Sequence, residues 1–120
     1  MPSSLGLVLD CRDPDQLAPF WSAALDYTTA GGAGGYVLLV PAGRPGPHLL
    51  LQRVPEARVG KNRMHLDLHT PDIEAEATRL TGLGARRLAA VPLEEHGSHW
   101  IVMADPEGNE FCVCDGGGGC

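Results

Sequence analysis

Polar and apolar side chains alternate along one short segment of the chain. In order, this segment consists of Arg63, Met64, His65, Leu66, Asp67, Leu68 and His69. Neighbouring side chains of a strand point to opposite faces, so the spacing predicts a strand with its polar groups on one face. A histidine beside a carboxylate, as in His65 and Asp67, can act as a general base whose tautomer the carboxylate fixes. The pair can equally be a buried hydrogen bond with a structural role. His69, at the strand end, is expected in solvent.

A cysteine near the end of the chain is the second candidate for chemistry. In a predicted strand over 109–114, Cys112 shares a face with Glu110 and Cys114, and Phe111 and Val113 lie on the other. A cysteine there can be a nucleophile or a soft metal ligand, and it can also be a small buried apolar side chain. The four cysteines include no Cys-x-x-Cys pair, so we expect reduced thiols and no structural zinc.

Two further residues are candidates for contacts with a ligand. Asp10 shares a strand face with Gly6 and Val8, where it can approach a cavity or instead cap the following turn. Trp100 follows His96-Gly97-Ser98-His99, a segment suited to a loop over a cavity, where its ring can stack on a flat ligand. It can equally be a core residue, and its position in the predicted strand does not decide which face it occupies.

The charge of the chain disfavours two classes of partner. Nine lysines and arginines against fifteen acidic residues give a formal net charge of −6, and the basic residues form no cluster of more than two. Nucleic acid and anionic membranes are therefore not expected as partners. Apolar runs such as residues 36–40 are far shorter than the ~20 residues that span a bilayer. With no secretory signal recognised either, the cytoplasm is the expected location.

The strands and helices that would position these side chains are predicted from the spacing of apolar residues and from the capping and turn residues that bound each segment. The first half predicts a strand over 5–11, a helix that begins after Asp13 and carries Phe20 and Trp21 in its core face, a short edge strand over 27–30, and strands over 36–40 and 48–54. The second half predicts a strand from residue 63, a helix after Asp72, and strands over 85–91, 99–104 and 109–114. Aligning Leu9 on Leu68 gives a repeat of 59 residues, which indicates two βαβββ modules.

These modules, the turn Asp105-Pro106-Glu107-Gly108-Asn109 before the last strand and the segment Phe20-Trp21-x-x-Ala24-Leu25 resemble the vicinal oxygen chelate superfamily. This superfamily includes the glyoxalase and bleomycin-resistance proteins. The segments 9–11, 61–68 and 104–112 are similar to the actinobacterial glyoxalase-like domain. The resemblance implies an α+β fold in which two βαβββ modules form curved mixed sheets around a cavity. One domain over 1–115 is expected, with modules at about 5–54 and 63–114 and a flexible glycine-rich tail over 116–120.

The resemblance also implies four positions for metal ligands, on the first and last strands of each module. They correspond to Gly6 and Gln52, with a possible slip to Arg53, in the first module and to His65 and Cys112 in the second. His65 is the only residue that matches the usual ligand type. His65 and Cys112 together can bind zinc or copper, but a catalytic zinc site needs about three protein ligands. We therefore expect no tightly bound metal and no other cofactor, with a divalent metal such as zinc as the alternative.

The predicted function is binding of a small organic molecule in the sheet cavity by a cytoplasmic homodimer. Its site residues are His65 and Asp67, with Asp10, Gln52, Trp100 and Cys112 as further ligand contacts. The alternative is a lyase or isomerase in which His65 is the base, Asp67 orients it, and Cys112 or a weakly held divalent metal polarises the substrate. Classical glyoxalase I activity is disfavoured, because the usual histidine and glutamate ligands are largely missing. A third possibility is a domain with a filled cavity that associates with another protein.

Overall fold

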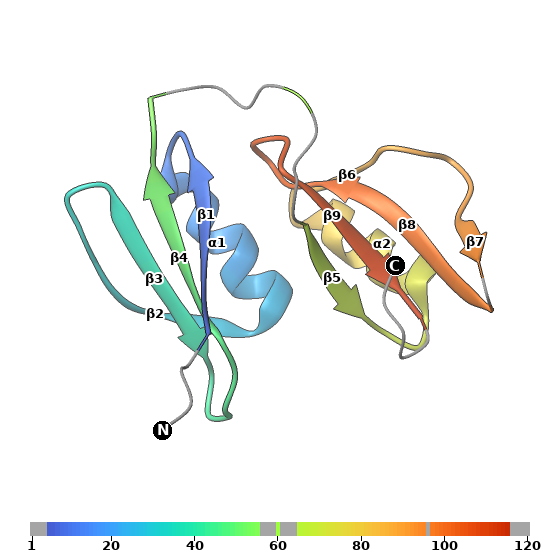
Figure 1. The fold of residues 1–120 in the computed structure, drawn as a ribbon, viewed down its shortest axis with the longest axis horizontal. Helices are drawn as coiled ribbons and strands as arrows, with labels where there is room; N and C mark the ends of the chain where they lie inside the picture. Colours follow the sequence, from blue (N-terminus) through green and yellow to red (C-terminus); the bar gives the residue numbers. More distant parts are fainter. Residues whose placement is uncertain (1–4, 56–59, 61–64, 96, 116–120) are drawn as a thin grey trace. The chain divides into compact units, whose positions relative to one another are not determined.

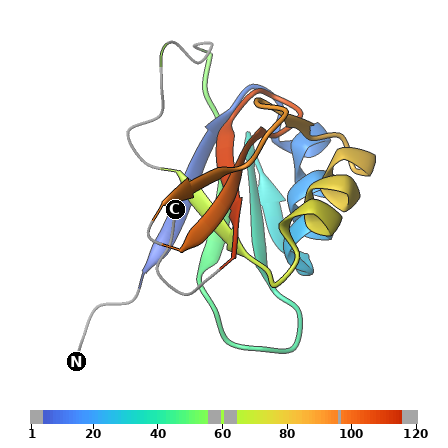
Figure 2. The ribbon, with the colours of Figure 1, turned by 90° about the vertical axis from the view of Figure 1, so that its right-hand side faces the viewer.

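The computed structural model describes residues 5–55, 60, 65–95 and 97–115. The chain divides into two compact units, Met1–Ala57 and Arg58–Cys120. Each unit has a sheet and one helix, which lies along one face of that sheet (Figures 1 and 2). None of the described helices is long and apolar enough to cross a membrane.

The first unit is a βαβββ module, as predicted. Its elements are β1 (Gly6–Cys11), α1 (Pro14–Leu25), β2 (Tyr27–Ala33), β3 (Tyr36–Pro41) and β4 (His48–Arg53). The strand order is β1-β4-β3-β2, with β1 parallel to β4 and the other pairs antiparallel. The sheet is therefore mixed. Helix α1 connects β1 to β2, which begins the antiparallel part of the sheet.

Helix α1 begins where its capping residues predict. The Asp13 carboxylate accepts a hydrogen bond from the Gln16 N–H at 3.2 Å, and a proline occupies the first helical turn, where its missing N–H costs nothing. Phe20 and Trp21 are buried and pack edge to face, with ring centroids 5.1 Å apart. Their assignment to the core is confirmed.

The edge strand β2 is longer than predicted. It extends to Ala33 through Gly31 and Gly32, which the sequence treats as loop residues. The pairing with β3 shifts in register between Thr29 and Gly31, so the strand accommodates its glycines at a bulge instead of ending there.

The second unit repeats this plan with its edge strand split in two. Its elements are β5 (Leu66–His69), α2 (Ile73–Gly82), β6 (Arg86–Arg87), β7 (Leu93–Glu95), β8 (Ser98–Ala104) and β9 (Glu110–Cys114). The strand order is β5-β9-β8-β6, β7 also pairs with β8, and β5 is parallel to β9. Both units are thus α+β modules with mixed sheets, as the sequence predicts.

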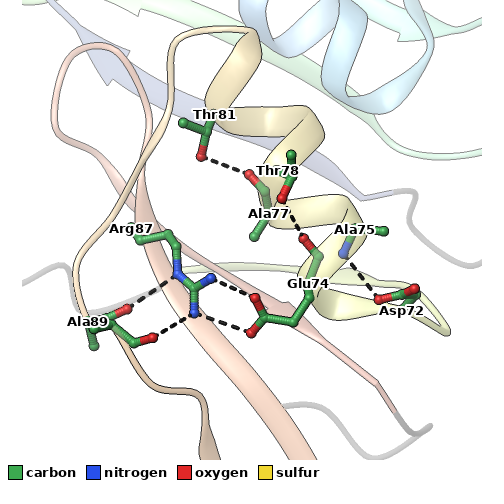
Figure 3. A network of polar contacts seen from close by, with 9 residues as sticks. Asp72, Glu74, Ala75, Ala77, Thr78, Thr81, Arg87 and Ala89 are labelled. Carbon is green, nitrogen blue, oxygen red and sulfur yellow. Dashed lines mark hydrogen bonds and ion pairs between the residues drawn. The ribbon is translucent and has the colours of Figure 1, made fainter.

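The predicted strand over 85–91 is wrong for most of its length, and Figure 3 shows the physical reason. Arg87 forms a two-pronged ion pair with Glu74 of α2, with Nη1–Oε1 at 2.8 Å and Nη2–Oε2 at 3.3 Å. The same guanidinium donates to the carbonyls of Ala89 and Ala90. Those carbonyls are therefore occupied by a side chain, and regular pairing with β8 ends after β6.

Candidate functional site

The centre of the candidate site is a histidine, an aspartate and a cysteine in the second unit. The pairing of β5 and β9 sets Asp67 opposite Cys112, and His65 precedes β5 by one residue. His65 Nε2 lies 3.1 Å from Asp67 Oδ1. One ligand atom from each of His65, Asp67 and Cys112 lies within 4.8 Å of the other two. The structure thus brings together three of the residues that the sequence singles out.

The register assigns these residues to one face of the sheet, which we call the polar face. It carries Asp67, His69, Trp100, Val102, Cys112 and Cys114. The large buried side chains of the neighbouring positions, such as Ile101, Met103 and Phe111, form the other face. Trp100 pairs with Cys114 and is partly exposed, so the structure assigns it to the polar face, a choice that the sequence leaves open.

The side chains of His65 and Asp67 are 38% and 25% exposed. This partial exposure leaves the imidazole accessible to a small molecule. His65 Nε2 faces the Asp67 carboxylate at 3.1 Å, and a neutral imidazole has one ring nitrogen that can accept a proton or a hydrogen bond. The pair can therefore do acid–base chemistry or bind a polar ligand group.

Cys112 is a thiol that is only 6% exposed. Its position depends on the turn that leads into β9, which a buried aspartate holds. Asp105 Oδ1 accepts hydrogen bonds from the backbone N–H groups of Glu107 and Asn109, each at 2.9 Å, and Oδ2 accepts one from Asn109 Nδ2 at 2.9 Å. The turn motif therefore fixes the start of the strand that carries Cys112.

A second group of possible ligands shares Asp67. Asp67, His69 and Cys114 each offer one ligand atom, and these three atoms also lie within 4.8 Å of one another. His69 Nδ1 lies 4.0 Å from Cys114 Sγ. Cys114 is disulfide-bonded, which corrects the expectation that all four cysteines are reduced, and its partner lies outside the described residues. His69 is exposed, as predicted.

In the first unit, Asp10 and Gln52 are direct neighbours in the parallel pair β1–β4, and Gln52 also pairs with Tyr36. The three side chains form a polar row on the sheet face opposite the buried leucines Leu49 and Leu51. Asp13, three residues further on, caps helix α1. Among the described residues, the Asp10 carboxylate has no hydrogen-bond partner.

The strand registers also locate the four positions that the family resemblance implies for a metal. Cys112 pairs with Asp67, and the repeat equivalent of Asp67 is Val8, which pairs with Leu50. The register therefore assigns Leu50, and not Gln52, to the first-unit position that corresponds to Cys112. Gly6 and Leu50 offer no donor side chain, so the four-ligand histidine and glutamate set does not fit this chain.

Two features of the second unit escape sequence reasoning. Asp67 is predicted only as a partner of His65, and its position opposite Cys112 requires a parallel register that no local pattern encodes. His99 contacts two carboxylates, with Nε2 at 2.8 Å from Glu94 and Nδ1 at 3.2 Å from Asp115. Glu94 belongs to β7, a strand that is not predicted. Arg63, Met64, His96 and the tail over 116–120 lie outside the described residues.

Comparison with known proteins agrees with this architecture. The family described as "glyoxalase-like domain" matches residues 6–114. The fosfomycin resistance protein FosX from Listeria monocytogenes is 13% identical with a TM-score of 0.77, covering 98% of this chain and 96% of that one. A lactoylglutathione lyase from Agrobacterium tumefaciens is 20% identical with a TM-score of 0.68, covering 97% and 96%.

A third similar structure is a glyoxalase-related enzyme from Fulvimarina pelagi, 16% identical with a TM-score of 0.73, covering 97% and 89%. A search of the curated proteins found no match. At these identities the structures show a shared fold, and the family match spans nearly the whole chain. The chain therefore belongs to the glyoxalase-like domain family of the glyoxalase/bleomycin-resistance/dioxygenase, or vicinal oxygen chelate, superfamily.

Proposed function

We propose that the protein binds a small organic molecule at the polar face of its second sheet, with His65 and Asp67 contacting the polar groups of the ligand. The observation that carries this proposal is the partly exposed His65–Asp67 pair, 3.1 Å apart and beside the Cys112 thiol. The His65 side chain is 38% exposed, so its ring nitrogens can reach a polar group of a ligand that binds from solvent.

Trp100 and Val102 supply the apolar part of the proposed site. Both lie on the polar face and both are partly exposed, so a flat or apolar portion of a ligand can cover surface that is otherwise in contact with water. Similar structures include proteins named for fosfomycin resistance and as a lactoylglutathione lyase, which supports a small-molecule ligand. Asp10 and Gln52 of the first unit remain predicted ligand contacts.

The test is native mass spectrometry of the untagged protein, followed by titration with fosfomycin, bleomycin and S-lactoylglutathione monitored by thermal shift. We expect a co-purified small molecule or a saturable shift that His65→Ala and Asp67→Asn each reduce by about tenfold or more in affinity. His48→Ala is the matched control, because His48 is an exposed histidine at the start of β4. A ligand that both site variants bind as well as the parent protein does would refute the assignment.

A second candidate is a lyase or isomerase. The placement of His65 favours it, because Nε2 lies 3.1 Å from the Asp67 carboxylate, which can orient the imidazole so that Nδ1 removes a proton from a bound substrate. Exchange of ligand hydrogen with solvent deuterium, lost in His65→Ala with ligand binding retained, would support this reaction. Ligand binding without exchange would favour the binding function.

We also propose that the protein is a homodimer without nucleic-acid or membrane partners. The homodimer follows from the family resemblance, and the absence of the other partners from the acidic net charge. Sedimentation equilibrium at micromolar concentration should give twice the chain mass of 12.7 kDa. A mass of one chain would contradict the homodimer.

A further inference from the structure

We propose that residues 86–95, at one edge of the second sheet, form the surface through which the protein pairs with a second copy of itself. We call this stretch the edge segment. It consists of β6, β7 and the loop between them, and both strands pair with β8 on the side away from β9 (Figure 1). The inference rests on the homodimer proposed above and names the surface that would hold it together.

The edge segment exposes large apolar side chains on a projecting loop. Leu88, Val91 and Leu93 are 42%, 73% and 48% exposed. The Leu88 N–H donates to the carbonyl of Val102 at 2.9 Å, and Leu93 pairs with Trp100, so residues 89–92 stand opposite a single residue of β8. The loop must therefore project from the sheet edge. Exposed apolar side chains gathered in one place are typical of an interaction surface.

The loop is held in place at both ends. Arg87 forms its two-pronged ion pair with Glu74 of α2 and also donates to two carbonyls of the loop, at 3.4 and 3.2 Å. At the other end, Glu94 Oε2 lies 2.8 Å from His99 Nε2, and β7 pairs with β8. A loop that is fixed before association loses little conformational entropy when it binds, which favours a contact through this surface.

The order of side chains in the edge segment identifies the partner. The segment reads Arg86-Arg87-Leu88-Ala89-Ala90-Val91-Pro92-Leu93-Glu94-Glu95, with two arginines first, two glutamates last and a leucine third from either end. In a two-fold dimer one patch faces the same patch of the other copy. Antiparallel placement about an axis at the middle of the segment sets Arg86 opposite the partner subunit's Glu95 and Leu88 opposite the partner subunit's Leu93. Opposite charges and apolar side chains thus meet.

The charge of the whole chain makes this match significant. Each copy carries a formal net charge of −6, so two copies repel each other through most of their surface. The edge segment carries two positive and two negative side chains and is itself neutral. Arg86 and Glu95 are both exposed at its ends. A second copy can therefore approach this surface without like charges facing each other.

The first experiment compares two substitutions by sedimentation equilibrium from micromolar to millimolar concentration. Val91→Asp sets two carboxylates close to the two-fold axis and should weaken the dimer by at least about tenfold. Leu5→Asp is the matched control, because Leu5 lies in the first unit and is 72% exposed, against 73% for Val91. It should leave the dimer unchanged.

The second experiment exchanges the charges at the ends of the segment. Arg86→Glu and Glu95→Arg each set like charges opposite each other, twice per dimer, and should each weaken association by about three- to tenfold at low salt. The double variant restores opposite charges and should return to within about twofold of the parent protein. A role of either side chain within its own chain does not predict this rescue.

The third experiment reads proximity directly. Ala90→Cys places a thiol beside the two-fold axis, so mild oxidation should give a disulfide-linked dimer on a non-reducing gel. Ala75→Cys substitutes another exposed alanine of the second unit, on α2, and should give no more linked dimer than the parent protein does.

The outcomes separate this surface from the homodimer itself. A parent dimer that Val91→Asp and the charge variants leave unchanged would overturn the edge segment as the interface and leave the homodimer standing. A parent protein that stays monomeric at every concentration would contradict both, without bearing on ligand binding at the polar face. A loss of stability in Val91→Asp that does not depend on protein concentration would also overturn the proposal, because it would show that Val91 packs within its own chain.

Discussion

Asp67 and Cys112 lie directly opposite each other in the parallel pairing of β5 and β9. This relationship joins two segments of the chain that are 45 residues apart and gives the candidate site a carboxylate and a thiol side by side. His65, two residues before Asp67, completes the group from the same strand segment. The site is therefore a product of strand register, and the predictions below separate its chemistry from the stability of the fold.

Replacing His65 by alanine should have little effect on stability. Its side chain is 38% exposed, and partly exposed ion pairs typically contribute about 1 kcal/mol or less to the free energy of unfolding. Urea denaturation of His65→Ala should therefore differ from the parent protein by less than about 1 kcal/mol. A loss several times larger would assign the histidine a structural role.

The turn before β9 should be far more sensitive. Asp105 is 3% exposed and its two carboxylate oxygens accept bonds from the Glu107 and Asn109 backbones and from the Asn109 amide. Asp105→Ala leaves these buried donors unsatisfied and should cost about 2–4 kcal/mol in urea denaturation. Asp105→Asn keeps one oxygen acceptor and should lose less. Equal, small losses in both variants would show that the network does not stabilise the turn.

Substitution of Gly108 tests the backbone of the same turn, and Gly6 of β1 provides a matched control. Gly108 has φ of +88°, so Gly108→Ala should destabilise by about 1–2 kcal/mol although an added Cβ meets no atom within 4 Å. Gly6 has equally open surroundings without a positive φ, so Gly6→Ala should be close to neutral. The two melting temperatures give the comparison, and equal shifts would contradict a conformational origin.

The contribution of Glu76 to helix α2 should depend on pH. Hydrogen bonds from Arg79, at 2.7 and 2.8 Å, lower the pKa of Glu76 from its ordinary value of 4.5. A lowered pKa means that the stabilisation is complete above the unfolded-state pKa and disappears as the pH falls through the folded-state pKa. Glu76→Gln should therefore cost about 0.3–0.5 kcal/mol at pH 7. The melting-temperature difference from the parent protein should vanish in strong acid, and a constant difference would refute this origin.

Much of the fold is readable from the sequence because its signals are local. Asp13 and Asp72 each precede a helix and cap it, and the alternation in β4 and β9 matches their pairing. The predictions fail where contacts between residues far apart in the sequence determine the local structure. Gly31 continues a strand at a bulge, and Arg87 occupies carbonyls that a longer strand would need.

Only part of the site can be predicted from the sequence, because the rest depends on pairing between strands that are far apart in the chain. The sequence shows that His65 and Asp67 share a face, because a strand has a period of two. It does not show which residue of the last strand meets them, because that depends on the parallel register between β5 and β9. For the same reason, the assignment of Gln52 from the family resemblance differs from the position of Leu50 in the register.

The long separation between Asp67 and Cys112 has a consequence for biosynthesis. The two halves of the site leave the ribosome at different times, and β5 emerges well before the strand that supplies its thiol. A nascent chain that ends before residue 112 therefore carries the histidine–carboxylate pair without its third member. The three side chains come together only when β9 pairs with β5, so the candidate site is complete only after the last strand of the second unit has been made and has folded.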